Sequence, residues 1–246
     1  MNAAPLFEVF SSVQGEATHV GELHLFVRMA GCDLECAFCD TPASHRIPAQ
    51  CRVHLPDGSV EEEPNPVPRA RLGEIVARLE AEAGPHRAVA LTGGEPLLFA
   101  DYLEPLARAW RKEGFSILLE TGGHRPAELA RLLDAVDWVM ADIKIASSSG
   151  ESVADETVLR FLALASRKEC AVKVVVSARS TVEEILRCAR LVAEAAPGSP
   201  LVLQPVSGAR FSPPRGERLL ALQRAALRVH PLVRVIPQLH RSLHVR

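Results

Sequence analysis

Short apolar segments alternate with amphipathic segments of helical period along most of the chain, and this alternation constrains the fold more than any other feature. Strand-like segments that are apolar on both faces are typical of parallel strands covered by helices. Within 69–83, the apolar residues Leu72, Ile75, Val76 and Leu79 fall on one helical face. Strands are predicted over 23–29, 88–91, 116–119, 138–141, 171–176, 201–203 and 233–236, and helices over 69–83, 101–112, 127–133, 153–165, 182–195 and 216–229.

These elements predict an α/β protein with a parallel sheet and helices outside. Two architectures fit: an open doubly wound sheet, and a full or partial β/α barrel. Both place functional sites at the carboxyl ends of the strands, where polar and glycine-rich residues recur in this chain. About six parallel strands are too few for a complete eightfold barrel, and the glycine-rich turns lack a dinucleotide-binding fingerprint.

Composition excludes several classes of protein. The chain has 246 residues, 48% of them apolar and 24% charged, which fits one large folded domain over residues 1–246. A formal net charge of −2 argues against a nucleic-acid partner. No apolar run is long enough to cross a membrane, and the first residues lack a signal-peptide pattern. We therefore expect a cytoplasmic protein with no membrane partner.

One segment, residues 42–68, departs from the alternation. It contains six prolines, an acidic run at 61–63, and the turn sequence Pro56-Asp57-Gly58 between two short extended stretches. This pattern predicts an inserted hairpin or flap within the domain. Because the segment directly follows a cluster of cysteines, it is a candidate for shaping the mouth of a site there.

Three of the six cysteines, Cys32, Cys36 and Cys39, have the spacing C-x3-C-x2-C. In a reducing compartment, clustered cysteines more often bind metal than pair as disulfides. Three thiolates on one loop can hold three irons of a 4Fe–4S cluster and leave the fourth iron open to a ligand. The alternative is a tetrahedral zinc site completed by Cys51 or His45, as in a zinc-stabilised binding module.

Outside this cluster, Cys170 and Cys188 are expected to be small core residues. Arg28 interrupts an otherwise apolar strand, where an unpaired buried charge is costly. Its partner is either the carboxylate of a ligand or an internal acid such as Glu16 or Glu120.

The cysteine loop follows a predicted strand, and Thr92-Gly93-Gly94-Glu95-Pro96 follows the next one. Together they resemble the radical S-adenosylmethionine (SAM) enzymes, in which a Gly-Gly-Glu-Pro stretch binds the methionine part of SAM. The resemblance implies a partial β/α barrel resembling a TIM barrel, with a 4Fe–4S cluster and SAM as cofactors.

A narrower resemblance covers most of the chain. Residues 7–16, with Gln14-Gly15-Glu16, and the sequence Cys39-Asp40-Thr41 are similar to the 7-carboxy-7-deazaguanine synthase family. The similarity recurs at 142–144, 203–206 and 237–241. It implies a lyase of queuosine and 7-deazapurine biosynthesis that converts 6-carboxy-5,6,7,8-tetrahydropterin to 7-carboxy-7-deazaguanine with loss of ammonia.

The resemblance also implies the roles of individual residues. The residues implied to bind the substrate are Val13, Gln14, Gly15, Glu16, Arg28 and Thr92, with Gln238 and His240 as further candidates. The residues implied to bind SAM are Phe38, Cys39, Asp40, Gly94, Glu95, Asp142, Ile143, Lys144, Gln204 and Ser207. The ligands of the cluster are Cys32, Cys36 and Cys39, and that of Mg2+ is Thr41.

Several of these residues have simpler interpretations from sequence alone. Residues 14–16 also fit a solvated loop with a turn glycine, Thr41 also fits a turn cap before Pro42, and Asp142 and Lys144 also fit an ion pair at the strand end. The expected partners are an electron donor such as flavodoxin or ferredoxin and a second copy in a homodimer. A glycyl-radical-enzyme activating enzyme, which shares the cysteine loop, is the alternative function.

Overall fold

A computed structural model describes residues 1–207 and 212–246. Its main sheet has ten strands in the order β12-β11-β10-β9-β8-β7-β3-β2-β4-β5, and a separate pair joins β1 to β6. The strands of the main sheet are β2 (Leu6–Val13), β3 (Leu23–Met29), β4 (Gln50–His54), β5 (Val60–Pro64), β7 (Ala88–Gly93), β8 (Ser116–Thr121), β9 (Trp138–Asp142), β10 (Glu169–Val176), β11 (Leu201–Pro205) and β12 (Val233–Val235); β1 is Ala3–Ala4 and β6 is Val67–Pro68.

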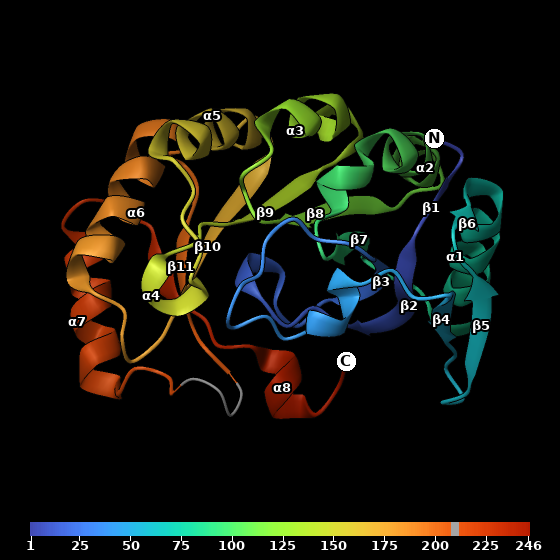
Figure 1. Cartoon of the computed structure of the whole chain (residues 1–246), viewed down its shortest axis with the longest axis horizontal. Helices are drawn as coiled ribbons and strands as arrows, with labels where there is room; N and C mark the ends of the chain where they lie inside the picture. The colour runs from blue at the N-terminus through green and yellow to red at the C-terminus, as the bar shows by residue number, and fades with distance from the viewer. Residues whose placement is uncertain (208–211) are drawn as a thin grey trace.

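From β3 through β7 to β12, each strand pairs in parallel with the next one in the sheet, and from β7 onward the strands follow one another in chain order. In a doubly wound sheet the strand order reverses partway along the sheet, and here it does not. The strand order therefore excludes the doubly wound architecture. The sheet curves as an open barrel with helices along its outer side (Figure 1). The predicted partial β/α barrel is therefore confirmed.

The helices that cover the sheet begin and end close to the predicted positions. They are α1 (Arg69–Ala83), α2 (Ala100–Lys112), α3 (Pro126–Leu132), α5 (Asp155–Ala165), α6 (Val182–Ala195) and α7 (Gly216–Leu227). Two short helices, α4 (Ala146–Ser149) and α8 (Leu239–Leu243), were not predicted. Among the described residues, the helices include none with the length and apolar character needed to cross a membrane.

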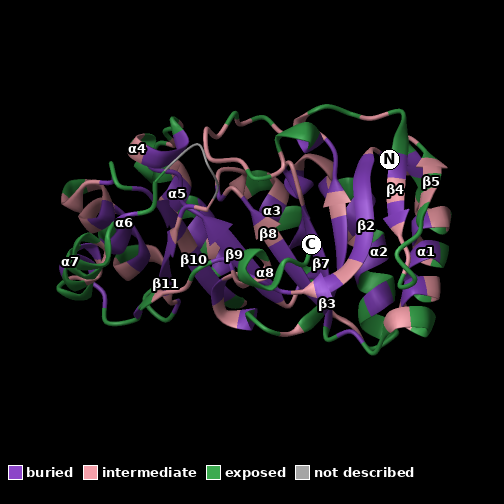
Figure 2. Ribbon diagram, turned by 90° about the horizontal axis from the view of Figure 1, so that it is seen from below, coloured by how far each residue is buried: buried purple, intermediate pink, exposed green. Residues whose placement is uncertain are grey.

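Strand residues alternate between two apolar cores. Along β7, Val89 and Leu91 pack in the large core between sheet and helices, whereas Ala88 and Ala90 face a smaller core inside the barrel. The inner core also contains the stacked rings of Phe10 and Phe26. Buried residues follow the strands through the centre of the molecule (Figure 2). This inner core fills one end of the barrel, so the carboxyl ends of the strands are left to form a site.

The strand β2 was not predicted, and it extends the sheet beyond β3. It runs antiparallel to β3, with Glu8 opposite Arg28, and its other edge pairs with β4. The predicted hairpin lies within 42–68 as the antiparallel pair β4 and β5. This hairpin forms the edge of the sheet, and the cavity described below takes only His45 from that segment.

Candidate active site

A large cavity opens at the carboxyl ends of the parallel strands. Its empty volume, with the open solvent at its mouth included, is ≈ 1240 Å³. Most residues that were assigned to the site line it: Val13, Gln14, Gly15, Glu16, Arg28, Cys32, Cys36, Phe38, Cys39, Asp40, Thr92, Gly94, Glu95, Asp142, Lys144, Gln204, Ser207, Gln238 and His240. Thr41 and Ile143 are not part of this lining.

The cysteine loop is held on both sides by neighbouring segments. The Ala37 N–H donates to the Ser149 carbonyl oxygen at 2.7 Å, which joins the loop to α4. On the other side, the Asp33 carboxylate accepts from Arg125 Nη2 at 2.8 Å. These contacts fix the loop by atoms other than its thiols, so the sulfur atoms remain free to bind a ligand.

Cys32, Cys36 and Cys39 are unpaired, half-buried thiols around the same cavity. Burial raises the pKa of each, to about 11 for Cys36, while the ammonium of Lys144 acts in the opposite direction. Thiols in such a site are protonated unless a metal compensates the thiolate charge. The donor set therefore fits a 4Fe–4S cluster with three protein ligands.

The alternative zinc site is not favoured by the geometry. His45 Nε2 lies 3.4 Å from Cys39 Sγ, but Cys51 is fully buried in the outer core. Zinc holds its ligand atoms within about 4 Å of one another. Within the part of the chain that the structure describes, ligand atoms gather at such spacing only at Glu16, Asp40 and His240, not at the cysteines. Cys170 and Cys188 are buried core residues, as predicted.

The Gly-Gly-Glu-Pro turn packs directly against the start of the cysteine loop. A Cβ on Gly94 would lie 2.0 Å from the Gly31 carbonyl oxygen, and Gly93 has φ +128°. The N–H of Glu95 donates to that same oxygen at 2.9 Å. Glycine is therefore required here because two backbone segments meet.

The side chain of Glu95 is held by hydrogen bonds within the chain. Its carboxylate accepts from Leu97 N–H at 3.0 Å, Thr121 Oγ1 at 2.8 Å and Gly122 N–H at 2.9 Å. Burial raises its pKa, and these bonds partly offset the shift. The carboxylate ties the end of β7 to the end of β8.

Residues after β9 form the side of the cavity next to the cysteines. Lys144 Nζ lies 2.9 Å from Asp142 Oδ2, as the ion-pair interpretation predicted, and 5.1 Å from the centre of the Phe38 ring. Asp142 Oδ1 and Gln204 Oε1 are buried acceptors without a hydrogen bond from any of the described residues. Such orphan acceptors call for donors from a ligand, and the hydroxyl and amino groups of SAM suit them. Ile143, in contrast, packs in the outer core.

The opposite side carries the residues assigned to the pterin. Gln14 Nε2 donates to Glu120 Oε1 at 2.7 Å, and Thr92 Oγ1 donates to Glu120 Oε2 at 2.7 Å. Glu16 accepts from Gln204 Nε2 at 3.0 Å and from Gln238 Nε2 at 2.6 Å. This is an ordered polar network rather than the solvated loop that sequence alone left open.

Arg28 is held by an acid other than the two considered from sequence. Its Nε donates to Glu8 Oε1 at 3.0 Å, and its guanidinium lies 5.6 Å from the Phe10 ring centre. Glu8 also contacts His54 at 3.0 Å and Arg246 at 3.1 Å. Among the described residues, only the Nε of Arg28 makes a hydrogen bond, so its Nη groups are available to a carboxylate in the cavity.

Thr41 lies at the rim, beside the cavity lining. It precedes the short 3-10 helix η2 (Pro42–His45), but its side chain makes no capping hydrogen bond. Its hydroxyl instead donates to Asp40 Oδ1 at 3.1 Å. The turn-cap interpretation is therefore wrong for the side chain, and the hydroxyl oxygen remains able to bind a cation.

The end of the chain closes over the N-terminal block. Leu239 N–H donates to the Gly15 carbonyl oxygen at 2.8 Å, and a Cβ on Gly15 would lie 1.9 Å from His240 Nδ1. Arg246 also lines the cavity, and its carbonyl oxygen accepts from Ser12 Oγ at 2.8 Å. These contacts place the two C-terminal candidates, Gln238 and His240, on the same side as Glu16.

Glu8, Glu120 and Lys173 are among the residues in or near the cavity that were not assigned from sequence. Lys173 contacts Glu16 and lies 3.5 Å from Asp142 Oδ2. Glu8 and Lys173 each interrupt an apolar strand, which is the same signal that identified Arg28. Glu120 stands at the carboxyl end of β8, where polar residues mark the site.

Comparison with known proteins agrees with this geometry. The sequence pattern described as the radical SAM superfamily matches residues 26–205, well over half of the chain. The chain is therefore a radical SAM protein, and this superfamily implies a 4Fe–4S cluster and SAM as cofactors. A 7-carboxy-7-deazaguanine synthase of Geobacter sulfurreducens is 37% identical over 98% of this chain and 97% of its own length. The chain belongs to the family of 7-carboxy-7-deazaguanine synthases.

Further relatives support the same assignment. A 7-carboxy-7-deazaguanine synthase of Methanopyrus kandleri is 35% identical over 96% of this chain and 92% of its own. The crystal structure of QueE from Escherichia coli has a TM-score of 0.62 at 21% identity and covers 97% of this chain and 95% of that one, so it supports the fold. Family membership argues against the glycyl-radical-enzyme activating enzyme and the zinc-stabilised module.

Proposed function

We propose that the protein converts 6-carboxy-5,6,7,8-tetrahydropterin to 7-carboxy-7-deazaguanine with loss of ammonia, in queuosine and 7-deazapurine biosynthesis. The observation that carries the proposal is that one cavity brings the three cysteines together with Gln14, Glu16 and Arg28. Family membership supports the same reaction. When bound, the cluster and SAM supply the radical chemistry that starts the ring contraction.

The residues of the chain hold the two cofactors on one side of the cavity. Cys32, Cys36 and Cys39 would hold the cluster. Asp142 would accept from SAM through Oδ1, since Oδ2 is occupied by Lys144. The remaining SAM-side residues of the proposal are Phe38, Asp40, Gly94, Gln204 and Ser207, all of which line the cavity, together with Glu95.

The pterin would lie against the opposite network. Arg28 would bind its carboxylate through the free Nη groups, while Glu8 holds the guanidinium in place. The Glu16 carboxylate would accept from the N–H groups of the ring edge, and Gln14 can both donate and accept. Val13, Gly15, Thr92, Gln238 and His240 complete this side of the cavity.

Magnesium would bind at the Thr41 hydroxyl. This oxygen is a hard donor at the rim, hydrogen-bonded to Asp40. One weak protein ligand suffices for Mg2+ when water and the oxygens of the substrate complete its shell. Thr41 would then orient the substrate carboxylate through the cation.

The remaining parts of the proposal concern the setting of the enzyme. We infer a cytoplasmic homodimer that receives electrons from a flavodoxin or ferredoxin. Clustered cysteines without a disulfide are typical of a reducing compartment, which supports this location.

The experiment that tests the proposed function is anaerobic turnover of the reconstituted protein. Carboxytetrahydropterin, SAM, Mg2+ and a reductant are supplied, and the product is identified by mass spectrometry. Formation of 7-carboxy-7-deazaguanine and ammonia supports the proposal. SAM cleavage without this product, at saturating pterin, contradicts it.

A further inference from the structure

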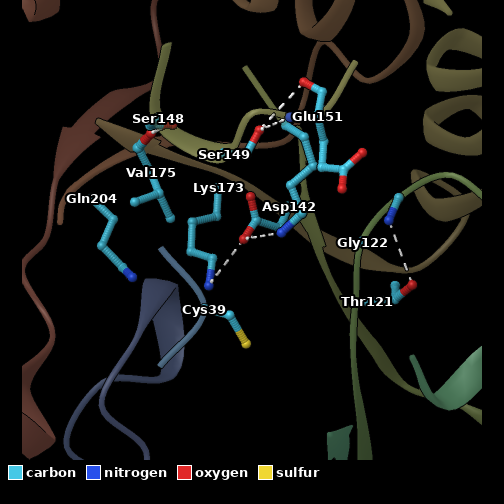
Figure 3. A network of polar contacts seen from close by, with 12 residues as sticks. Cys39, Thr121, Gly122, Asp142, Ser148, Ser149, Glu151, Lys173, Val175 and Gln204 are labelled. Atoms are coloured by element: carbon cyan, nitrogen blue, oxygen red, sulfur yellow. Dashed lines mark hydrogen bonds and ion pairs between the residues drawn. The ribbon is translucent and has the colours of Figure 1, made fainter. Parts of the chain in front are cut away.

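A buried lysine on β10 stands between the two sides of the cavity. Lys173 lies opposite Asp142 in the parallel pairing of β10 with β9. Its side chain is only 13% exposed. The ammonium group contacts the Glu16 carboxylate and lies 3.5 Å from Asp142 Oδ2, as Figure 3 shows for Asp142. A single cation thus joins two carboxylates from distant parts of the chain.

These two carboxylates differ in the other partners that hold them. Asp142 already has the ammonium of Lys144 at 2.9 Å. Glu16 has two amides, those of Gln204 and Gln238, as its other side-chain partners. Lys173 is therefore the one cation among the described residues that contacts Glu16 directly.

We propose that Lys173 is a positioning residue for the pterin, which keeps the Glu16 carboxylate ionised and aimed at the ring edge. This inference rests on the proposed function, because it needs a ligand whose N–H groups meet Glu16. Lys173 has no contact with the cysteines that would hold the cluster, so its effect is expected on pterin binding rather than on cluster retention.

The electrostatics of the site support this assignment. Burial raises the pKa of Glu16, but the charge and hydrogen bond of Lys173, with the two amides, lower it to about 2. The other charged or titratable groups around this pair are Asp40, Glu120, Asp142, Lys144 and His240. Three of them are acids, so without Lys173 the buried Glu16 carboxylate is left in surroundings that favour its protonation.

The test measures pterin and SAM affinity of the reconstituted, anaerobic holoenzyme between pH 5.5 and pH 8. In wild type, we expect pterin affinity to vary little with pH, because Glu16 stays ionised. In Lys173→Met, we expect affinity about tenfold weaker at pH 8 and at least about tenfold weaker again at pH 5.5, as Glu16 takes up a proton. SAM affinity should change less than about threefold. Lys173→Gln is measured in parallel in case the Met variant does not fold.

Two matched variants separate this role from a structural one. Lys173→Arg keeps the cation and should restore a flat pH profile, whereas Glu16→Gln should bind the pterin weakly at every pH. A double variant, Lys173→Met with Glu16→Gln, should lose the pH dependence. Folded Met or Gln variants with wild-type affinity, or equal and pH-independent loss of pterin and SAM affinity, would overturn the inference. Failure of wild type itself to bind the pterin while it binds SAM overturns the proposed function, and this inference with it.

Discussion

The two sides of the cavity are built in different ways. On the cysteine side, three thiols are half-buried without a disulfide, and Asp142 Oδ1 and Gln204 Oε1 lack hydrogen bonds within residues 1–207 and 212–246. On the opposite side, the carboxylates of Glu8, Glu16 and Glu120 each have at least two side-chain partners. One side is incomplete without exogenous groups, and the other is ordered by the chain alone.

This difference indicates which side of the cavity is suited to bind cofactors and which is suited to bind a substrate. Unsatisfied buried groups cost free energy, so they persist where a bound ligand satisfies them. A network whose partners are all present fixes the orientation of its side chains before any ligand arrives. The cysteine side is therefore suited to hold cofactors, and the opposite side is suited to select and orient a substrate. Four substitutions test this division, from the largest expected effect to the smallest.

The cysteine side should depend fully on its three thiols. Changing Cys32, Cys36 or Cys39 to Ala is expected to abolish cluster binding, because two thiolates cannot hold the cluster in place. Iron content and the brown colour after anaerobic reconstitution measure this. Cys51→Ala is the matched control, since Cys51 is buried in the core. A colourless Cys51 variant would show that the cluster has a different ligand set.

Substitutions on the side opposite the cysteines should weaken substrate binding and leave cofactor binding unchanged. Arg28→Ala is expected to weaken pterin binding by about 2–5 kcal/mol, roughly 30-fold to several thousandfold, with little change in SAM binding. Glu8→Gln, which leaves Arg28 in place but removes the charge behind it, should cost about tenfold. Equilibrium binding of both ligands checks this. Equal loss of pterin and SAM affinity in Arg28→Ala would mean that Arg28 supports the fold instead.

Activity should depend on Mg2+ through Thr41, which lies at the rim between the two sides of the cavity. Thr41→Ala is expected to blunt the rise of activity with added Mg2+, while Thr41→Ser retains most of it, because only the hydroxyl oxygen binds the cation. Activity against Mg2+ concentration is the measurement, with the spectrum of the cluster as control. If Thr41 did not bind the cation, the folded Ala variant would keep the same magnesium curve as wild type.

The smallest effect is expected at the ion pair between Arg125 and Asp33, which holds the cysteine loop against the segment before α3. The Arg125–Asp33 ion pair is 24% and 33% exposed at its two side chains. Surface pairs of this kind contribute about 1 kcal/mol or less, so Arg125→Ala should lower the melting temperature by at most about 2–4 °C. Iron content should stay near that of wild type. Loss of the cluster in a folded Arg125 variant would mean that the loop depends on this fastening.

Sequence predicted the parallel part of the fold well because most of its strands are largely apolar and are followed by an amphipathic helix. The strand β2 has a different pattern. Glu8, Ser11 and Ser12 interrupt it, and it pairs antiparallel to β3, so no helix marks it. The helix α8 has only five residues, which is shorter than the window of roughly 11–18 residues over which a helical period can be recognised.

The functional site, like the fold, could be predicted from the sequence only in part. Motifs placed the cysteines and Gln14-Gly15-Glu16 around one cavity, because both belong to contiguous stretches. The partner of Arg28 could not be predicted, since Glu8 comes to lie opposite it only through the register of the unpredicted β2. Lys173 could have been found, because it interrupts an apolar strand just as Arg28 does.

The position of Arg246 has a practical consequence for handling the protein. Arg246 lines the cavity, and its contacts with Ser12 and Glu8 keep this part of the backbone at the cavity wall. A bulky group attached to the backbone at Arg246 would therefore lie at the cavity wall, where it would compete with ligands for space. Met1 is 65% exposed and does not line the cavity. Purification tags and fluorescent reporters therefore belong before Met1.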